Sequence, residues 1–558
     1  MRTLMIMIAA LLLGGPAVWG QNSMGSEAIM NFLGTDDPQD LDHDEVERLE
    51  FLLEYPLKIN ISDESNLRRS GLFSSYQVAV ITDYISRHGP IRTSLELSYL
   101  DGFSASIVER LSPFIDLSVG ESEHKEVRQQ VAVRGSGKWL EDQSPDAAYA
   151  IKYRINARDR LNGTVAMSRS YGESSMWPSS FSGSLAWSPG SRALKVVAGD
   201  FHARFGQGLT LWSNSFMADP TSPDNFMKRP SGITQPWSFT GSGSLTGCAV
   251  EIGSGHWKVS AMSAFPGIKE TRSGILQFMP AVNLAWFGRS GHVSLTNVLH
   301  MPMSQSSPKT AFMTGLDAAF CVRGVNIFGE IACDWLTMTP KALAGTRFRA
   351  GEQTDMAVQV KAFMSDQYGI ACSGMHSLRK ATLLWVIDAC STSPGRQIKV
   401  RFSYEYLFNE CWKLKLRLSE RVRTWGLPFR TDARVDLAYT GSSWTASMRM
   451  NILSSDKTGC LSYVEGGFNG EKLTAYLRQG IFFIDDWDDR IYVYERDAPG
   501  SFNVPAMYGR GVWTSMTASI KMPSSLRLYA RASYVCYPFM EKKKPGKAEL
   551  KLQLQYRF

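Results

Sequence analysis

The final nine residues of the chain alternate between apolar and polar side chains. Leu550, Leu552, Leu554, Tyr556 and Phe558 alternate with charged or amide residues. Successive side chains of a β-strand point to opposite faces, so this spacing predicts a strand with one apolar face. Similar segments recur roughly every 10–15 residues from about residue 121 onward. The pattern predicts a long succession of antiparallel strands rather than one isolated strand.

These strands are expected to form a transmembrane antiparallel β-barrel in residues 121–558. Lipid cannot satisfy backbone hydrogen bonds, so a sheet whose apolar face meets lipid must close on itself. Tryptophans near the predicted strand ends fit interfacial girdles: Trp139, Trp187, Trp286, Trp385, Trp412 and Trp444. The alternation template predicts about 22–26 strands, with weak segments between residues 209 and 245 as candidate loops. No run of ~20 apolar residues follows the N-terminus, which excludes a helical inner-membrane protein.

The N-terminus is typical of a secretory signal peptide, residues 1–20. Arg2 supplies the positive region, Leu4 to Leu13 the apolar region, and Val18-Trp19-Gly20 a small-residue cleavage site. No cysteine lies near that site, which argues against a lipid anchor. The eight cysteines fall between Cys248 and Cys536 without motif spacing, so free thiols facing lipid or packed in the wall are expected rather than a disulfide scaffold.

Residues 21–120 differ in charge and pattern from the body. They carry 7 Lys and Arg against 17 Asp and Glu, a net charge of −10, whereas residues 121–558 are at +16. Apolar residues at helical spacing predict short helices: one carrying Val46 and Leu49 and ending at Pro56, and others beginning near Asp63, Ser74, Ser94 and Ser104. We therefore predict an acidic, all-α domain ahead of the barrel.

Residues 57–117 resemble tandem helix-hairpin-helix units of competence-type DNA-binding proteins. The resemblance rests on Asn60, Gly89-Pro90, Glu96-Leu97 and two turns, Gly71-Leu72-Phe73 and Gly102-Phe103-Ser104. In those proteins a second glycine lets backbone N–H groups approach a phosphate. Phe73 and Ser104 stand at that position here, and the acidic charge opposes phosphate contact. Docking on the barrel or on a periplasmic protein is therefore favoured over DNA binding by these six turn residues.

The whole chain resembles the helix-hairpin-helix-containing outer-membrane proteins of Gram-negative bacteria. Besides the leader and the barrel, two stretches carry this resemblance, residues 199–209 (GDFHARFGQGL) and residues 490–511, which include RIYVYE, PGSF and YGRG. A C-terminal strand ending in an aromatic resembles the closing strand of outer-membrane barrels. That resemblance implies that Tyr556 and Phe558 belong to the signal read by the barrel-assembly machinery, and that outer-membrane lipid surrounds the barrel.

Several side chains are candidates for lumen chemistry. Gly206-Gln207-Gly208 either bends the backbone into the lumen, with Arg204 as a fixed charge, or forms a β-bulge or strand kink that shapes the barrel, which we favour. A mostly basic set faces the predicted lumen and either attracts anions or pairs with Glu405, Asp436 and similar carboxylates: Lys399, Arg401, Lys413, Lys415, Arg417, Arg434 and Arg449. Asp485, Asp486, Asp488 and Asp489 resemble a calcium-binding cluster only in composition; a solvated turn is favoured, and no metal or cofactor is predicted.

Nothing in the sequence indicates catalysis. The eight histidines are scattered without metal-ligand spacing, and neither HExxH nor GxSxG occurs. An enzyme would need Ser, His and Asp side chains brought together near one rim, so an enzyme is not predicted.

The expected protein is an outer-membrane barrel that serves as a transport pore or an assembly scaffold. An even number of strands places both barrel ends on the periplasmic side, where the helical domain either recruits a periplasmic partner or plugs the lumen. A DNA-binding or DNA-uptake channel is the alternative.

Overall fold

The computed structural model describes residues 25–558 except for 34–42, 63, 120–126, 142–143, 158–159, 190–193, 214–220, 240–242, 267–275, 304–308, 352, 364–366, 427–428, 502, 524 and 542–543. The predicted signal peptide lies outside the described residues. Among the described helices, none is long and apolar enough to cross a membrane.

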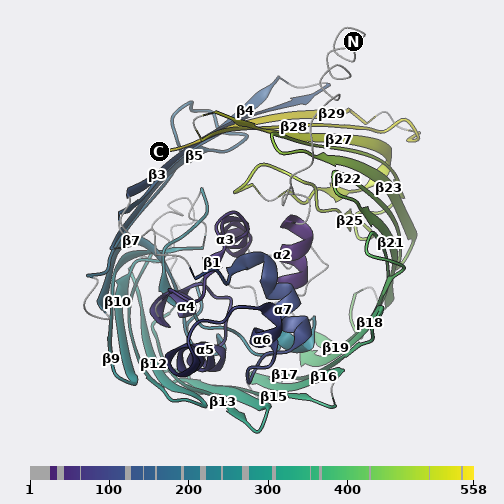
Figure 1. Ribbon diagram of the computed structural model, residues 1–558. Helices are drawn as coiled ribbons and strands as arrows, with labels where there is room; N and C mark the ends of the chain where they lie inside the picture. Colours follow the sequence, from purple (N-terminus) through teal and green to yellow (C-terminus); the bar gives the residue numbers. More distant parts are fainter. Residues whose placement is uncertain are drawn as a thin grey trace.

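The body of the chain is a closed antiparallel barrel of 24 strands (Figure 1), which confirms the predicted fold class and strand number. Its strands are β3 Val127–Leu140, β4 Asp146–Ala157, β5 Leu161–Arg169, β6 Ser180–Trp187, β7 Leu194–Arg204, β9 Leu245–Ser254, β10 Trp257–Ala264, β11 Gln277–Phe287, β12 Gly291–Pro302, β13 Ala311–Val322, β14 Val325–Asp334, β15 Thr339–Arg349, β16 Thr354–Phe363, β17 Gln367–Ser377, β18 Ala381–Thr392, β19 Gly395–Leu407, β20 Trp412–Arg423, β21 Phe429–Thr440, β22 Trp444–Ser454, β23 Thr458–Asn469, β24 Leu473–Ile484, β27 Gly509–Met522, β28 Leu526–Cys536 and β29 Lys547–Arg557. Each strand pairs with the next in sequence.

Pairing between β29 and β3 closes the barrel. Gln129 and Phe558 exchange two backbone hydrogen bonds, of 2.9 and 3.1 Å, at the end of this pair. We call this end the terminal rim, because β3 begins and β29 ends there. The opposite end, where β7 leads into β9 and β24 into β27, is the loop rim. Both ends of the barrel sequence meet at one rim because the number of strands is even.

The outer face of the barrel is apolar, as the alternation predicts. On β29, Leu550, Leu552 and Leu554 are exposed while Gln553 and Gln555 are buried inside. Exposed tryptophans lie at strand ends on both rims. Trp139 is near the end of β3 at the loop rim, and five others are on the terminal rim, on β6, β10, β11, β20 and β22: Trp187, Trp257, Trp286, Trp412 and Trp444. Trp385 is an exception, since it lies inside β18 opposite Gly374 rather than at a strand end. A closed sheet with this outer surface is suited to a lipid environment.

The N-terminal part is a small helical domain. Its elements are α2 Gly25–Leu33, α3 His43–Glu54, β1 Leu57–Lys58, α4 Glu64–Arg69, α5 Ser75–His88, α6 Ser94–Ser98, α7 Ala105–Leu111, η2 Ser112–Phe114 and β2 Ile115–Asp116. Ser74 and Ser104 cap α5 and α7 as their N-cap residues, because each side chain accepts a backbone N–H three residues on. The helices from His43 to Leu111 match the sequence pattern, whereas α2 was not predicted.

This domain has a hydrophobic core of its own. Every residue of that core lies between Ala28 and Ile115, and no barrel residue belongs to it. The parallel pair β1–β2 joins the start and end of the main segment, with Leu57 opposite Ile115. The Asn60 side chain donates to Ile91 O and Leu117 O at 2.9 and 2.8 Å and accepts from Ile91 N. The domain is thus closed by its own backbone and apolar contacts.

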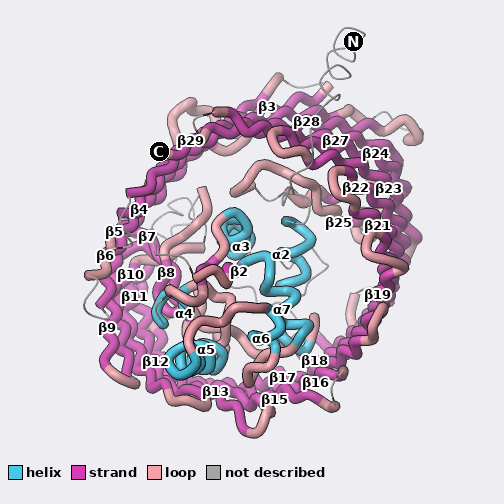
Figure 2. Tube along the Cα trace, viewed as in Figure 1, coloured by secondary structure: helices cyan, strands magenta, loops and turns pink. Residues whose placement is uncertain are grey.

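The helical domain lies within the ring of strands. Figures 1 and 2 show α2 to α7 surrounded by the wall, nearer to β12–β17 than to β21–β23. Two segments from the loop rim also turn inward. One follows β7 and contains η3 Pro223–Asn225 and β8 Gly232–Thr234; the other follows β24 and contains β25 Ile491–Tyr492 and β26 Ala506–Met507. We call them the first and second inserts.

We expect Phe558→Ala to reduce assembly far more than it reduces stability. The Phe558 ring is 53% exposed and stacks on Tyr556 with centroids 5.3 Å apart, so its loss leaves no core cavity. Barrel assembled in the outer membrane should fall several-fold, while refolding of the purified chain in detergent stays unchanged. Leu554→Ala, on the same face, is the control and should affect neither. Equal assembly of all three proteins would contradict the assigned signal.

Candidate functional site: the interface between the helical domain and the barrel

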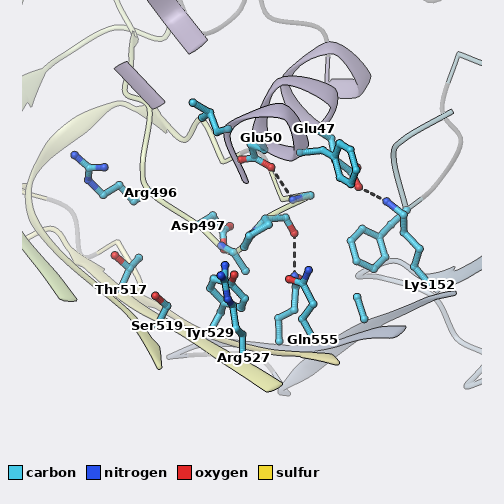
Figure 3. A pocket seen from close by; sticks show the side chains of 18 of the residues that line it. Glu47, Glu50, Lys152, Arg496, Asp497, Thr517, Ser519, Arg527, Tyr529 and Gln555 are labelled. Carbon is cyan, nitrogen blue, oxygen red and sulfur yellow. Dashed lines mark hydrogen bonds and ion pairs between the residues drawn. The ribbon is translucent and has the colours of Figure 1, made fainter. Parts of the chain in front are cut away.

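Helix α3 carries one set of polar contacts between the domain, the wall and the inserts. The Glu47 carboxylate forms an ion pair with Lys152 of β4, and Lys152 also donates to Trp237 O in the first insert. One turn further along α3, the Glu50 carboxyl group accepts from the backbone N–H of Gly500 in the second insert at 2.9 Å. Figure 3 shows Glu47 and Glu50 pointing from α3 toward the wall and the second insert. The acidic helix therefore binds a basic wall and a backbone donor.

A second anchor lies at the other side of the domain. Asp224 of η3 is buried and forms ion pairs with Arg110 of α7 and Arg347 of β15, the latter at 2.5 Å. Burial acts to raise the pKa of Asp224, but the two guanidinium groups outweigh it and hold that pKa at about 2. One carboxylate of the first insert thus joins the domain to the wall.

Aromatic rings and basic side chains complete the interface. The guanidinium of Arg68 lies over the Phe287 ring at 3.9 Å, that of Arg154 over Trp237 at 4.1 Å, and that of Arg557 over Tyr55 at 4.7 Å. Arg349 of β15 donates to Phe103 O at 3.0 Å. Phe51 of α3 also contacts the ring of Trp237, with centroids 4.6 Å apart. Among the described residues, the hydrophobic core of the domain contains no barrel residue, so polar, cation–π and single aromatic contacts join the two parts.

The Gly206-Gln207-Gly208 segment turns the chain into the lumen, so the favoured β-bulge interpretation is wrong. Gly199 has a φ of 92°, and a Cβ there would lie 2.2 Å from Gly183 O. Asp200 accepts from Ser182 Oγ and Gly183 N of β6 and from Thr246 Oγ1 of β9 at 2.6–2.9 Å. This carboxylate joins the two neighbouring strands at the point where β7 leaves the wall.

Glu330 of β14 fixes the end of that turn. Its carboxylate accepts from the backbone N–H groups of Gln207, Leu209 and Thr210 at 2.6–3.0 Å and from Thr210 Oγ1 at 2.6 Å. Gly206 is left-handed (φ 61°), and a Cβ there would lie 2.8 Å from Glu330 Oε2. Residues 206–210 therefore wrap a carboxylate from β14, six strands further round the barrel from β7. Arg204, the predicted fixed charge, is buried in this turn.

The two hairpin turns face each other inside the domain. Leu72, Phe73, Phe103 and Ser104 are buried, and the rings of Phe73 and Phe103 lie 6.3 Å apart. Gly71 and Gly102 have positive φ, as their turns require. Backbone donors of the turns are already used: Leu72 N donates to Ser70 Oγ and Phe103 N to Leu100 O. The two turns therefore pack against each other, and Phe103 O accepts the hydrogen bond from Arg349 of the wall.

The predicted lumen charges face inward, and several of them pair with carboxylates. Lys413 lies 3.6 Å from Glu405, Arg417 lies 3.3 Å from Asp432, and Arg434 and Arg449 each lie 2.5 Å from Asp436. Lys399, Arg401 and Lys415 belong to the same inward-facing rows of β19 and β20. The pairing interpretation therefore accounts for much of this set.

The acidic run near Trp487 is divided among different partners. Asp485 pairs with Arg510 at 2.6 Å, Asp486 with Lys457 at 3.8 Å, and Asp489 accepts from Ser455. Within the part of the chain that the structure describes, no three His, Cys, Asp or Glu side chains are placed to hold a metal ion. All eight cysteines are free thiols, as predicted.

Several functional contacts were not predicted from the sequence. Glu47, Glu50, Lys152, Asp224 and Glu330 lie in separate segments, and no spacing connects them. The charge difference between the domain and the barrel was the available signal, since it predicts attraction without identifying the pairs. The motif-like stretches, residues 199–209 and 490–511, were a second signal, because they coincide with the inserts.

Comparisons with known proteins identify no family. No family model and no curated sequence matches the chain. Among solved structures, the translocation pore of the P pilus usher PapC aligns with 77% of this chain and 99% of its own at 8% identity and a TM-score of 0.39. The siderophore receptor PirA from Pseudomonas aeruginosa aligns with 78% and 81% at 8% identity and 0.41, and OpdR from the same species with 77% and 96% at 9% and 0.30. Similarity this low indicates neither a family nor an activity.

Glu330→Gln should release the first insert. Both carboxylate oxygens of Glu330 accept hydrogen bonds, so in either orientation the glutamine NH₂ group would face one of these donors. We expect this mismatch to destabilise the turn by about 1–3 kcal/mol. Protease cleavage within residues 205–239 should increase while the barrel keeps its heat-resistant mobility on gels. Glu405→Gln, another inward carboxylate, is the control. Unchanged cleavage in Glu330→Gln would show that the carboxylate does not hold the turn.

Docking of the domain should weaken as pH rises. Removal of Glu50 from water raises its pKa from 4.5 to about 8, against the opposing effect of the Gly500 N–H. The undocked carboxyl ionises near its ordinary pKa, so docking is strongest below pH 4.5 and weakens up to about pH 8, by less than about 1.4 kcal/mol per pH unit.

Protease release of the domain measures this effect. It should rise between pH 5 and 8 in the wild type and stay nearly flat in Glu50→Gln. Glu109→Gln, on an exposed position of α7, should behave like the wild type. If Glu50→Gln showed the same pH profile as the wild type, Glu50 would not be the group that makes docking pH-dependent.

Proposed function

We propose that the protein is an outer-membrane transport pore whose lumen is occupied by its own N-terminal helical domain, acting as a removable plug. The observation that carries this proposal is that the domain keeps a closed core of its own yet meets the wall through ion pairs. A domain with a complete hydrophobic core can leave the lumen as a rigid unit, because its departure exposes polar groups that water can solvate.

The orientation follows from the lengths of the connections. At the terminal rim, strands are joined by short turns such as those at residues 255–256 and 323–324, whereas the two inserts leave from the loop rim. Outer-membrane barrels carry short turns on the periplasmic side and longer loops outside. The terminal rim then faces the periplasm, and the domain enters the lumen from there.

A periplasmic partner is the expected source of force for plug release. Leu95 and Tyr99, beside each other at α6, are 66% and 82% exposed on the domain. Large exposed apolar side chains of this kind are typical of contact sites. The domain thereby offers a partner an apolar contact that its own core does not use.

Single-channel conductance in a planar bilayer tests the pore. Removal of residues 21–120 should enlarge the unit conductance, since the inserts remain but the domain no longer fills the lumen. Heat-resistant mobility on gels verifies that the shortened barrel has assembled. If neither protein conducts, the barrel is blocked by other means and the pore proposal fails.

A charge exchange tests the anchor without a deletion. Glu47→Lys and Lys152→Glu each place like charges together, so each should raise the frequency of opening. The double variant restores an ion pair and should close the pore again. If the double variant opens as often as the two single ones, the anchor does not control the plug.

A further inference from the structure

A small cavity lies where four parts of the chain meet. It has a volume of about 220 Å³, and Figure 3 shows it between helix α3 and the wall. Its lining comes from α3 of the domain, from both inserts, and from strands β3, β4, β24, β27, β28 and β29 of the wall. The volume lies just below the range of pockets for drug-sized ligands, so the space matches a solute of about one ring. We call it the junction cavity.

The wall side of the junction cavity is lined by hydroxyl and amide side chains. Strands β27, β28 and β29 are neighbours, and their register places Ser519 opposite Tyr529 and Tyr529 opposite Gln553. Two further residues line the cavity from the same strands, Thr517 of β27 and Gln555 of β29. We call these five residues the panel, which lies across from α3 in Figure 3. Hydroxyl and amide groups can both donate and accept hydrogen bonds.

One member of the panel has an unsatisfied acceptor. The Gln555 side chain is 3% exposed, and among the described residues its Oε1 has no hydrogen-bond partner. A buried carbonyl oxygen without a donor costs free energy, so a donor from a ligand in the cavity would be stabilised there. The amide of Gln553, by contrast, is used twice, because it accepts from Arg134 Nε and donates to Pro499 O, both at 2.9 Å.

The side of the cavity formed by α3 adds a hydrogen-bond donor and apolar rings. Burial raises the pKa of Glu50 to about 8, so its carboxyl group is largely protonated at neutral pH. One of its oxygens accepts from Gly500 N at 2.9 Å, which leaves the proton on the other oxygen. The rings of Phe51, Trp237 and Phe239 line the same cavity. Polar groups on one side therefore face a mixed polar and aromatic surface on the other.

Most charged side chains of the lining are occupied by other contacts. Three ion pairs engage lining residues: Glu47 with Lys152, Arg496 with Glu465, and Asp497 with Lys551. Two guanidinium groups lie over aromatic rings, Arg154 over Trp237 at 4.1 Å and Arg557 over Tyr55 at 4.7 Å. Selectivity in this cavity therefore comes chiefly from the panel and from Glu50.

The junction cavity adjoins a larger cavity that reaches the terminal rim. The larger cavity has a volume of about 970 Å³, and Phe51, Gln130 and Trp237 are among the residues that line both. Met522, the last residue of β27, and Phe558 line the larger cavity at the rim. A route for a small solute therefore leads from the terminal rim to the panel while the domain is docked.

We infer that the junction cavity binds a single sugar ring, with hydroxyl groups on the panel and on Glu50 and C–H faces against the aromatic rings. A sugar combines adjacent hydroxyl groups, which donate and accept, with apolar faces made of C–H groups. The panel supplies partners for both hydrogen-bonding roles, and the rings cover the apolar faces. A site whose buried polar groups are matched to hydroxyl groups rejects analogues that leave those groups unpaired.

A bound sugar should also hold the domain in place. The lining combines Glu50 and Phe51 of the domain with residues of the wall and the inserts, so the complete site exists only while the domain is docked. A ligand that binds only the docked state stabilises that state by mass action. This consequence rests on the proposed plug, whereas binding itself does not.

Isothermal titration calorimetry on the full-length protein, in a polyoxyethylene detergent that carries no sugar, tests the site. The probes are glucose, galactose and mannose, each as the D- and the L-enantiomer. We expect saturable binding of at least one hexose, with a preference of about tenfold or more for one of its enantiomers. The reason is that a fixed set of donors and acceptors matches only one handedness.

Two matched double variants locate the site. Thr517→Val and Ser519→Ala together remove two hydroxyl groups from the panel with little change in volume, and they should weaken binding about tenfold. Thr382→Val and Ser419→Ala remove the same groups from β18 and β20, where these residues lie opposite the inward-facing Glu405 and Asp432, and should leave binding unchanged. Heat-resistant mobility verifies that both variants are folded.

Three results would overturn the inference: no saturable binding of any of these hexoses, equal affinities for the two enantiomers, or equal weakening in both double variants. Protease release of the domain is then measured with the bound hexose at ten times its Kd, where the ratio of docked to undocked domain should rise about tenfold. Unchanged release despite binding would contradict the plug and leave the site standing, so the two failures are distinguishable.

Discussion

The width of the barrel is the constraint on which the rest of the structure depends. An apolar outer face forces the sheet to close, and 24 strands enclose a space far wider than the inward side chains can fill. The space is occupied instead by three parts of the same chain, the helical domain and the two inserts. Each of them must be bound to the wall by groups that remain compatible with a polar lumen, and ion pairs and backbone donors meet that requirement.

The inserts link the domain to the wall. Asp224 of the first insert binds Arg110 of the domain and Arg347 of the wall, and Gly500 of the second insert binds Glu50. Arg134 of the wall strand β3 in turn donates to Gly500 O at 2.7 Å. Movement of the domain therefore affects both inserts.

Local sequence patterns predicted much of this fold, but they could not predict contacts between segments that are distant in the sequence. Alternation identified the strands, and the apolar face of Leu550 to Phe558 identified the outer surface. Ser74 and Ser104 marked helix starts because capping is a local interaction. The turn at Gly206 was misjudged, because its partner Glu330 lies more than a hundred residues away and two glycines fit a bulge equally well. The anchors Glu47–Lys152 and Arg110–Asp224 were missed for the same reason.

The central claim is that the domain occupies the lumen in the intact membrane, and zero-length carbodiimide cross-linking measures it directly. This reagent joins a lysine to a carboxylate only where the two form an ion pair. Lys551 and Asp497 form such a pair between β29 and the second insert and serve as the internal standard. The account predicts that peptides containing Lys152 and Glu47 are joined in untreated outer membranes along with that standard. Recovery of the Lys551–Asp497 link without the Lys152–Glu47 link would contradict it.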